Sequence, residues 1–214
     1  RARQTFVDPH AFAGAHLRSI TPQDFPAGYP IPVIAWVDND AGHAVRVNGW
    51  LTASGHPGIK VKRGVGSGFL DATNPPGPLL YAAQIGGLQT SPTINVEANT
   101  AWTTVSGALA LDAVWAENSR IHVTGNLTVP TNGTLTVEAG TIVRVNPTNY
   151  IQNSGQIVIH GTTARPVVFM PTTPGQAWGG FIQHANNASF TATGAVFTGS
   201  GHLNCWFKGH ECSS

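Results

Sequence analysis

The stretch from Ile121 to Met170 constrains the fold of this chain more than any other part of the sequence. Two of its segments align with each other, because Gly133–Glu138 (GTLTVE) lies over Gly155–His160 (GQIVIH). The alignment places Leu135 over Ile157, an offset of 157 − 135 = 22 residues. A strand-rich repeat of about this length is typical of a β-solenoid, in which each coil buries its inward residues against the coils above and below.

Alternation of apolar and polar residues within these segments predicts which side chains face the interior. Coils are expected near residues 121–130, 133–147, 150–171 and 178–200. The predicted inward residues are Leu127, Val129, Leu135, Val137, Ile142, Ile157, Ile159, Val167 and Phe169. His122 and His160 alternate with inward residues, so they are expected to face outward on neighbouring coils. Trp102 and Trp115 are expected to close the first end of the solenoid, since open ends need caps.

The chain divides near residue 95, because the part before it lacks the coil repeat. Residues 1–95 contain short alternating segments separated by turn residues, which predicts an immunoglobulin-like β-sandwich. The turn 38–42 (DNDAG) joins two apolar runs and predicts a hairpin. In the segment 58–72, Ile59 and Val61 are expected inward and Lys60 and Lys62 outward. Residues 96–214 then form the solenoid and a C-terminal tail, so the fold class is all-β.

Composition limits the classes of function. Only 10% of the residues are charged and the net charge is +1, which argues against a nucleic-acid-binding protein. There is no run of 18 apolar residues, so no membrane-spanning helix is expected. A lysine-poor β-protein rich in Thr and Asn is expected outside the cell or at its surface.

The C-terminal tail holds the sharpest candidate for a site, the cluster His202, Cys205, His210 and Cys212. Two thiolates and two imidazoles are suitable ligands for Zn²⁺, although the spacing H-x2-C-x4-H-x-C differs from common zinc patterns. The alternatives are a Cys205–Cys212 disulfide, which an extracellular protein favours, and free thiols. The disulfide is the preferred interpretation. We expect no cofactor, with this zinc site and a calcium ion at the turn 38–42 as weaker alternatives; the turn lacks the Glu that an EF-hand loop requires, since Gly49 stands at that position.

Catalytic residues for polysaccharide cleavage are sparse. Glu138 is the only acidic residue in the coil region 121–201, accompanied by Arg144 and Arg165. Glycoside hydrolysis uses two carboxyl groups, so the sequence predicts no catalytic residues. Tryptophans that could stack on sugars are Trp50, Trp178 and Trp206, of which the first two are expected in the core or a cap.

The segment from Trp102 to Gly201 resembles a right-handed parallel β-helix module of large secreted bacterial surface proteins. The resemblance rests on Ile121–Pro130, Thr134–Val143, Gly161–Phe169 and the Trp-Gly-Gly at 178–180. The first half resembles the Ig-like module that precedes it in such proteins, which often carry lamin-tail or spore-coat-kinase-like domains. The resemblance implies a structural part of a surface protein.

These observations lead to one functional expectation and one alternative. We expect a non-enzymatic extracellular module for structure, assembly or adhesion, which associates with other copies of itself or with further domains of a larger surface protein. The alternative is a carbohydrate-binding or polysaccharide-cleaving β-helix protein, with glycans as partners.

Overall fold

The computed structural model describes residues 14–53, 56–71, 73–201, 206–207 and 210–211, and within these ranges it contains strands and no helix. The chain divides into two compact units, Arg1–Asn99 and Thr100–Ser214. The boundary expected near residue 95 would cut through strand β10 (Thr93–Glu97), which pairs with two strands of the first unit. The described residues include no helix of the length and hydrophobicity needed to cross a membrane.

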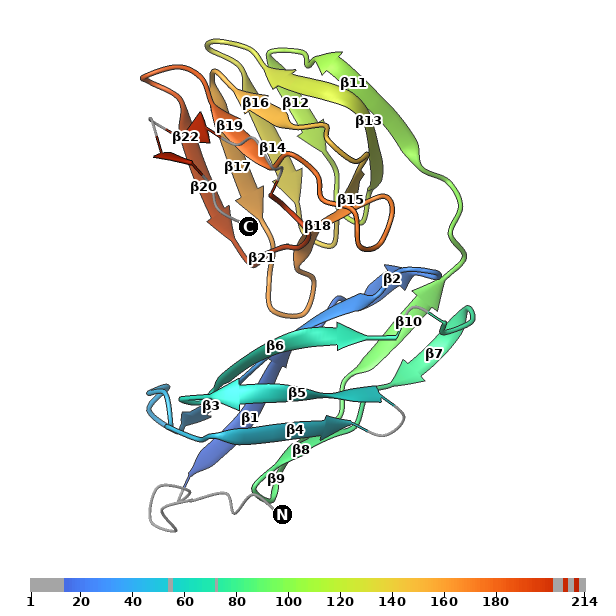
Figure 1. Ribbon diagram of the computed structural model, residues 1–214, viewed down its shortest axis with the longest axis vertical. Helices are drawn as coiled ribbons and strands as arrows, with labels where there is room; N and C mark the ends of the chain where they lie inside the picture. Colours follow the sequence, from blue (N-terminus) through green and yellow to red (C-terminus); the bar gives the residue numbers. More distant parts are fainter. Residues whose placement is uncertain (1–13, 54–55, 72, 202–205, 208–209, 212–214) are drawn as a thin grey trace. The chain divides into compact units, whose positions relative to one another are not determined.

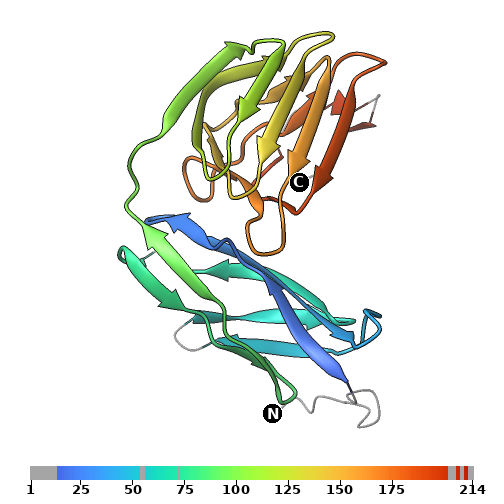
Figure 2. The same cartoon turned by 180° about the vertical axis from the view of Figure 1, so that it is seen from behind.

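The first unit contains a seven-stranded antiparallel sheet and a three-stranded sheet (Figure 1). The larger sheet has the order β1-β3-β6-β5-β4-β8-β9, and its end strands lie against each other, so the sheet curls. The smaller sheet has the order β2-β10-β7, and Figure 2 shows the chain from β1 to β2 crossing the back of the unit. The bounds are β1 Ala15–Ile20, β2 Asp24–Pro26, β3 Ile31–Asn39, β4 Gly49–Ala53, β5 His56–Lys62, β6 Val65–Leu70, β7 Gly77–Leu80, β8 Ala83–Ile85, β9 Leu88–Thr90 and β10 Thr93–Glu97.

The predicted turn at 38–42 is confirmed, but its pairing is only partly as expected. The side-chain oxygen of Asn39 accepts hydrogen bonds from the backbone N–H groups of Ala41 and His43, which closes the turn. After the turn, the N–H of Asn39 donates to the backbone oxygen of His43, and the N–H of Val45 donates to that of Val37. The hairpin pairing ends there, and the ladders of β3 are formed with β1 and β6. The return segment becomes a regular strand only at Gly49, where it pairs with β5.

The core of the first unit contains one polar group that the fold leaves unsatisfied. Tyr81 is fully buried, and its hydroxyl has no hydrogen-bond partner in the described part of the chain. Burial raises the pKa of Tyr81 to about 12 from the ordinary value of 10.0, because the apolar surroundings disfavour the phenolate.

We expect Tyr81→Phe to stabilise the first unit by about 1 kcal/mol, since a buried hydroxyl without a partner carries a desolvation cost. Because the pKa of Tyr81 is raised in the folded state, the pH-dependent part of the folding stability is fully present below pH 10. The wild-type protein loses this stability as the pH rises toward 12, because the unfolded chain releases the phenolic proton more easily. The advantage of the variant should therefore grow between pH 9 and about pH 11.5. Urea unfolding at both pH values measures this, with Tyr150→Phe in the second unit as the control; an equal difference at the two pH values would contradict the assignment.

The second unit is a stack of coils with three strands per turn. Its parallel strands form three stacks: β11-β13-β15-β18-β21, β11-β13-β16-β19, and β12-β14-β17-β20. The strands β11 and β13 are long enough to belong to both of the first two stacks: the first half of β13 pairs with β15 and its second half pairs with β16. The bounds are β11 Thr103–Ala108, β12 Asp112–Trp115, β13 Arg120–Val129, β14 Thr134–Glu138, β15 Ile142–Val145, β16 Ile151–Asn153, β17 Gln156–His160, β18 Val167–Pro171, β19 Phe181–Gln183, β20 Ser189–Thr193 and β21 Ala195–Phe197; the short β22 Trp206–Phe207 and β23 His210–Glu211 pair with each other.

The 22-residue register predicted from the sequence is confirmed. Strand β14 pairs with β17 so that Leu135 lies opposite Ile157 and Val137 opposite Ile159. The coils then lengthen, because Ile121, Val143, Phe169 and Phe197 stack at intervals of 22, 26 and 28 residues. The extra residues lie in the connections, where they leave the strand pairing intact.

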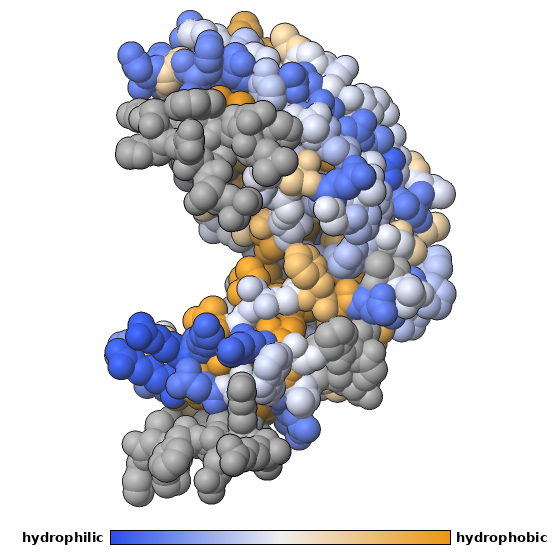
Figure 3. All heavy atoms as spheres, in the orientation of Figure 1, coloured by the Kyte–Doolittle hydropathy of each residue, from blue (hydrophilic) through white to orange (hydrophobic). Residues whose placement is uncertain are grey.

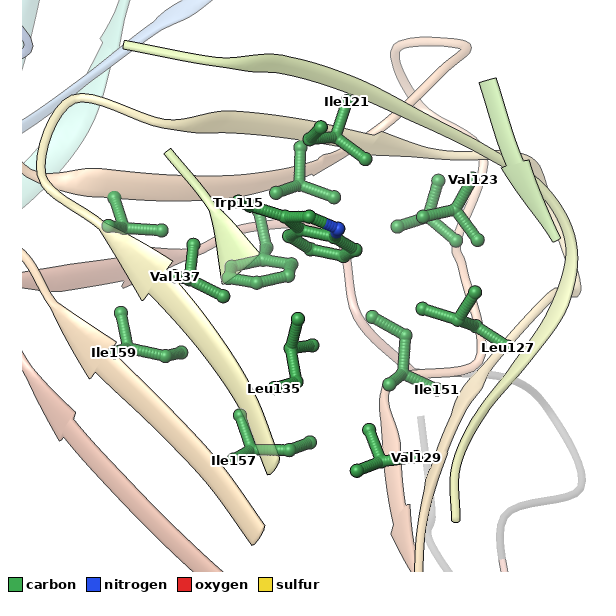
Figure 4. Close-up of a cluster of buried hydrophobic side chains, with 14 of the residues drawn as sticks. Trp115, Ile121, Val123, Leu127, Val129, Leu135, Val137, Ile151, Ile157 and Ile159 are labelled. Carbon is green, nitrogen blue, oxygen red and sulfur yellow. The ribbon is translucent and has the colours of Figure 1, made fainter. Parts of the chain in front are cut away.

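The nine residues predicted to face inward are all fully buried. Eight of them belong to the core between the three stacks, and Figure 4 shows Leu127, Leu135 and Ile157 converging there from different strands. Ile142 is also fully buried, but it is not a member of this cluster. On β15 it alternates with Val143 and Val145, which are the residues that enter this core.

Candidate functional site

The C-terminal cluster predicted as a zinc site or a disulfide cannot be placed in the fold. His202, Cys205 and Cys212 lie outside the described residues, and His210 is described only as part of the backbone of β23. In the described ranges, no group of three or more His, Cys, Asp or Glu side chains is arranged to hold a metal ion. The zinc, disulfide and free-thiol interpretations therefore stay predictions.

The turn 38–42 uses its carboxylates in contacts with neighbouring side chains. Asp38 accepts hydrogen bonds from Arg18 Nε and Trp36 Nε1, each at 3.2 Å. Asp40 Oδ1 lies 2.6 Å from His16 Nε2. The oxygen atoms that a calcium ion would need are thus oriented toward cationic and N–H groups of the strands β1 and β3, which gives this turn a structural role.

Four ionisable residues gather where the third stack turns toward the first. Glu138 and His160 face each other across β14 and β17, with Oε1 and Nδ1 3.4 Å apart. Glu117 accepts a hydrogen bond from Arg165 Nη1 at 2.6 Å, across 48 residues of sequence. Their side chains are 32–55% exposed, so these ion pairs contribute little stability. This corner therefore holds two carboxylates, each paired with a basic side chain.

A second polar network lies on the outer face of the first stack. Arg144 Nη2 lies 3.1 Å from His122 Nδ1, and His122 Nε2 lies 2.8 Å from Asn146 Oδ1. Because a guanidinium can only donate, Nδ1 is the acceptor and Nε2 carries the proton that His122 donates to Asn146. The same guanidinium lies 4.1 Å from the ring centre of Trp102, a cation–π contact. The network joins Trp102, which precedes β11, to the strands β13 and β15.

The two histidines expected to face outward lie on different sheets of the β-helix. Both His122 and His160 do point outward, but His122 lies on β13 and His160 on β17, which belong to different sheets. The reason is that 38 residues separate them, which is not a whole number of 22-residue coils.

The tryptophans fall into three environments. Trp115 and Trp178 are buried in the solenoid core, and Trp102 packs outside against Arg144. Of the two tryptophans expected to close the first end, only Trp115 lies in the interior. Trp50 is 51% exposed on β4, which corrects its assignment to the core or a cap. The Trp206 side chain lies outside the described residues.

Sequence reasoning missed an aromatic cluster at the last coil. Phe181, Phe190 and Phe197 come from one strand of each stack, and their ring centres lie 5.0–6.1 Å apart. Phe169 and Trp178 pack beneath them, at 5.1 Å and 5.5 Å from Phe181. Phe190 and Phe197 remain 39% and 40% exposed. Their regular alternation was present in the sequence, but the longer connections between the strands obscured it.

The end strands of the stacks at this coil have no further partner among the described strands. They are β19, β20 and β21, while β11 and β12 form the opposite end. Inward aromatic residues in three successive strands therefore close the core at one end with a partly exposed apolar surface.

Residues 107–200 match the family model of the pectate-lyase-like beta helix domain. The second unit contains a β-helix module. The matched range begins within β11 and ends just after β21, so it covers nearly all of the three strand stacks. Comparisons with curated proteins and with solved structures gave no match.

Proposed function

We propose that this chain is a non-enzymatic extracellular structural module, in which the β-helix is a scaffold that assembles with other copies of itself or with further domains of a larger surface protein. In this proposal the first unit is an immunoglobulin-like sandwich and the helix of coils is right-handed. One observation carries the proposal: the apolar end formed by Phe181, Phe190 and Phe197. Solenoid ends require a cover, and exposed apolar patches with unpaired strand edges favour association.

The polar side chains of the β-helix support a structural role over a catalytic one. Glu138 pairs with His160, Glu117 with Arg165, and His122 is held between Arg144 and Asn146. In this arrangement the ionisable groups cross-link successive coils.

Association through the apolar end predicts that the native mass in solution exceeds 22.4 kDa, the mass of one chain. Light scattering coupled to size exclusion, over a range of concentrations, measures this. Phe197→Lys places a charge on the exposed end and should return the mass to that of one chain, whereas Leu80→Lys on β7 of the first unit should leave it unchanged. A single-chain mass for the native protein at all concentrations would overturn association through this end.

A second candidate function, polysaccharide binding or cleavage by the β-helix, is favoured by the family match over residues 107–200. Its strongest residues are Glu138 and His160, which form an exposed pair of adjacent acid and base groups. Release of reducing or unsaturated ends from a panel of polysaccharides tests it. Release that Glu138→Gln abolishes would establish the enzyme and overturn the non-enzymatic proposal.

A further inference from the structure

The outer face of β4 and β5 in the first unit carries an exposed indole beside two lysines. Trp50 is 51% exposed and stands directly opposite Lys60 in the antiparallel ladder. Lys62 follows on the same face of β5, two residues along the strand. Figure 3 shows hydrophobic and hydrophilic residues side by side on the visible face of this unit.

Gly58 keeps the indole close to the sheet. A Cβ atom at this glycine would lie 3.4 Å from Trp50 Cε3, so the ring packs over the backbone of β5. One face of the indole is therefore supported by the strand, and about half of the side chain remains open to solvent. A rigid aromatic ring of this kind offers a platform on which an apolar ring face can stack.

The two lysines have no competing partner. Lys60 and Lys62 are exposed, and within the described part of the chain neither ammonium group forms a hydrogen bond or ion pair. They are two of only three lysines in the chain, the third being Lys208. Across the sheet, the carboxylate of Asp38 is on the same face, but it accepts hydrogen bonds from Arg18 and Trp36.

Polar groups for hydroxyl recognition lie beside the platform. Thr52 follows Trp50 on the outer face of β4 and stands opposite Gln84 of β8, and both residues are exposed. A hydroxyl and an amide provide donors and acceptors together.

We propose that Trp50, Lys60 and Lys62 form a binding site for an anionic glycan. A sugar ring stacks on the open face of the indole, the two ammonium groups hold its carboxylate or sulfate groups, and Thr52 and Gln84 bind hydroxyl groups. Single-stranded nucleic acid shares the aromatic and anionic chemistry, but it requires a series of stacking residues and a basic groove. Besides Trp50, this face exposes only one further aromatic ring among the described residues, Phe69 of β6, and the net charge of the chain is only +1, which argues against a basic groove. The site lies in the first unit, outside the residues that match the β-helix family, and does not depend on the scaffold proposal.

The test measures the affinity of the full chain for dextran, dextran sulfate and alginate. Dextran and dextran sulfate share a backbone, so their difference isolates the charge, while alginate supplies carboxylates. We expect at least one anionic polymer to bind at least about tenfold more tightly than dextran, with weaker binding at high salt. Binding of dextran sulfate alone assigns the lysines to sulfate, and binding of alginate alone assigns them to carboxylate.

Three variants connect that binding to the site. Trp50→Ala should lower the affinity at least about tenfold, as truncation of a central aromatic contact does, and Trp50→Phe should restore most of it. The double variant Lys60→Gln, Lys62→Gln should weaken binding and reduce its salt dependence. Leu80→Ala removes another exposed apolar side chain of the same unit and should have no effect.

Four results would overturn the proposal. They are no binding of either anionic polymer, equal binding of neutral dextran, an affinity that Trp50→Ala leaves unchanged, or tighter binding of a polythymidine oligonucleotide than of the glycans. Unfolding curves of all variants separate loss of the site from loss of the fold.

Discussion

Replacing Leu135 with aspartate is expected to unfold the β-helix module. Leu135 is fully buried, and its strand lies between β12 and β17 in the third stack, with Ala113 on one side and Ile157 on the other. An aspartate there would place an unpaired carboxylate in an apolar core, at a cost of several kcal/mol. Since single domains are stable by about 5–15 kcal/mol, the expected loss of more than about 4 kcal/mol is a large share of the total.

The neighbouring residue provides the control for this prediction. Thr136 is half-buried on the outer face of the same strand, so Thr136→Asp introduces the same charge where water reaches it. We expect Thr136→Asp to keep the strand signal in circular dichroism and Leu135→Asp to lose the part that belongs to the second unit. A Leu135→Asp variant with native strand content and native resistance to proteolysis would show that this position does not face the core.

The second large effect is expected from Gly155→Ala. This glycine begins the turn into β17, and a Cβ atom there would overlap the backbone oxygens of Gly133 and Pro130 in the coil below. Backbone atoms cannot move aside as the end of a flexible side chain can, so the two coils must separate locally. We expect a loss of about 3 kcal/mol, measured as a lower midpoint of urea unfolding.

Gly125→Ala separates this steric effect from the general cost of replacing a glycine. Its Cβ atom would meet only the side-chain Cβ of Ser106, at 3.3 Å. Neither glycine has a positive φ angle, so backbone strain does not distinguish the two substitutions. Equal midpoints for the two variants would contradict close packing of the coils at Gly155.

The turn at Gly155 also accounts for the burial of a polar side chain, that of Asn153. Asn153 is 2% exposed, and it donates through Nδ2 to the backbone oxygen of Ser189 and accepts through Oδ1 from the N–H of Gly155. Both polar ends of the buried amide are therefore satisfied. Asn153 stands at an inner position that alternation alone would assign to an apolar residue, and its partner Ser189 lies 36 residues away.

Much of the β-helix could be predicted from local sequence. Alternation identifies inner and outer positions because side chains in a strand point to opposite faces in turn. The repeat GTLTVE and GQIVIH fixes the register of β14 and β17 because both segments occupy the same place in successive coils. The last coils have longer connections, so the 22-residue offset no longer predicts which residues stack. For this reason Phe181, Phe190 and Phe197 were not recognised as one cluster.

The surface features could not be predicted in the same way. Trp50 lies in an apolar segment and was assigned to the core or a cap, but its strand alternates so that Leu51 enters the core and Trp50 faces solvent. Alternation divides the residues of a strand between the two faces of the sheet, but it does not identify the buried face. The buried face is decided by how strands that are distant in sequence pack together.

The sequence by itself determined the all-β character, the β-helix repeat and most of its inner residues, because these depend on strand periodicity and on the offset between neighbouring coils. Only the tertiary structure decided the curling of the seven-stranded sheet, the joining of Glu117 to Arg165 and the exposure of Trp50 next to Lys60. Those features depend on the three-dimensional path of the connections, which brings together side chains that have no fixed spacing along the chain.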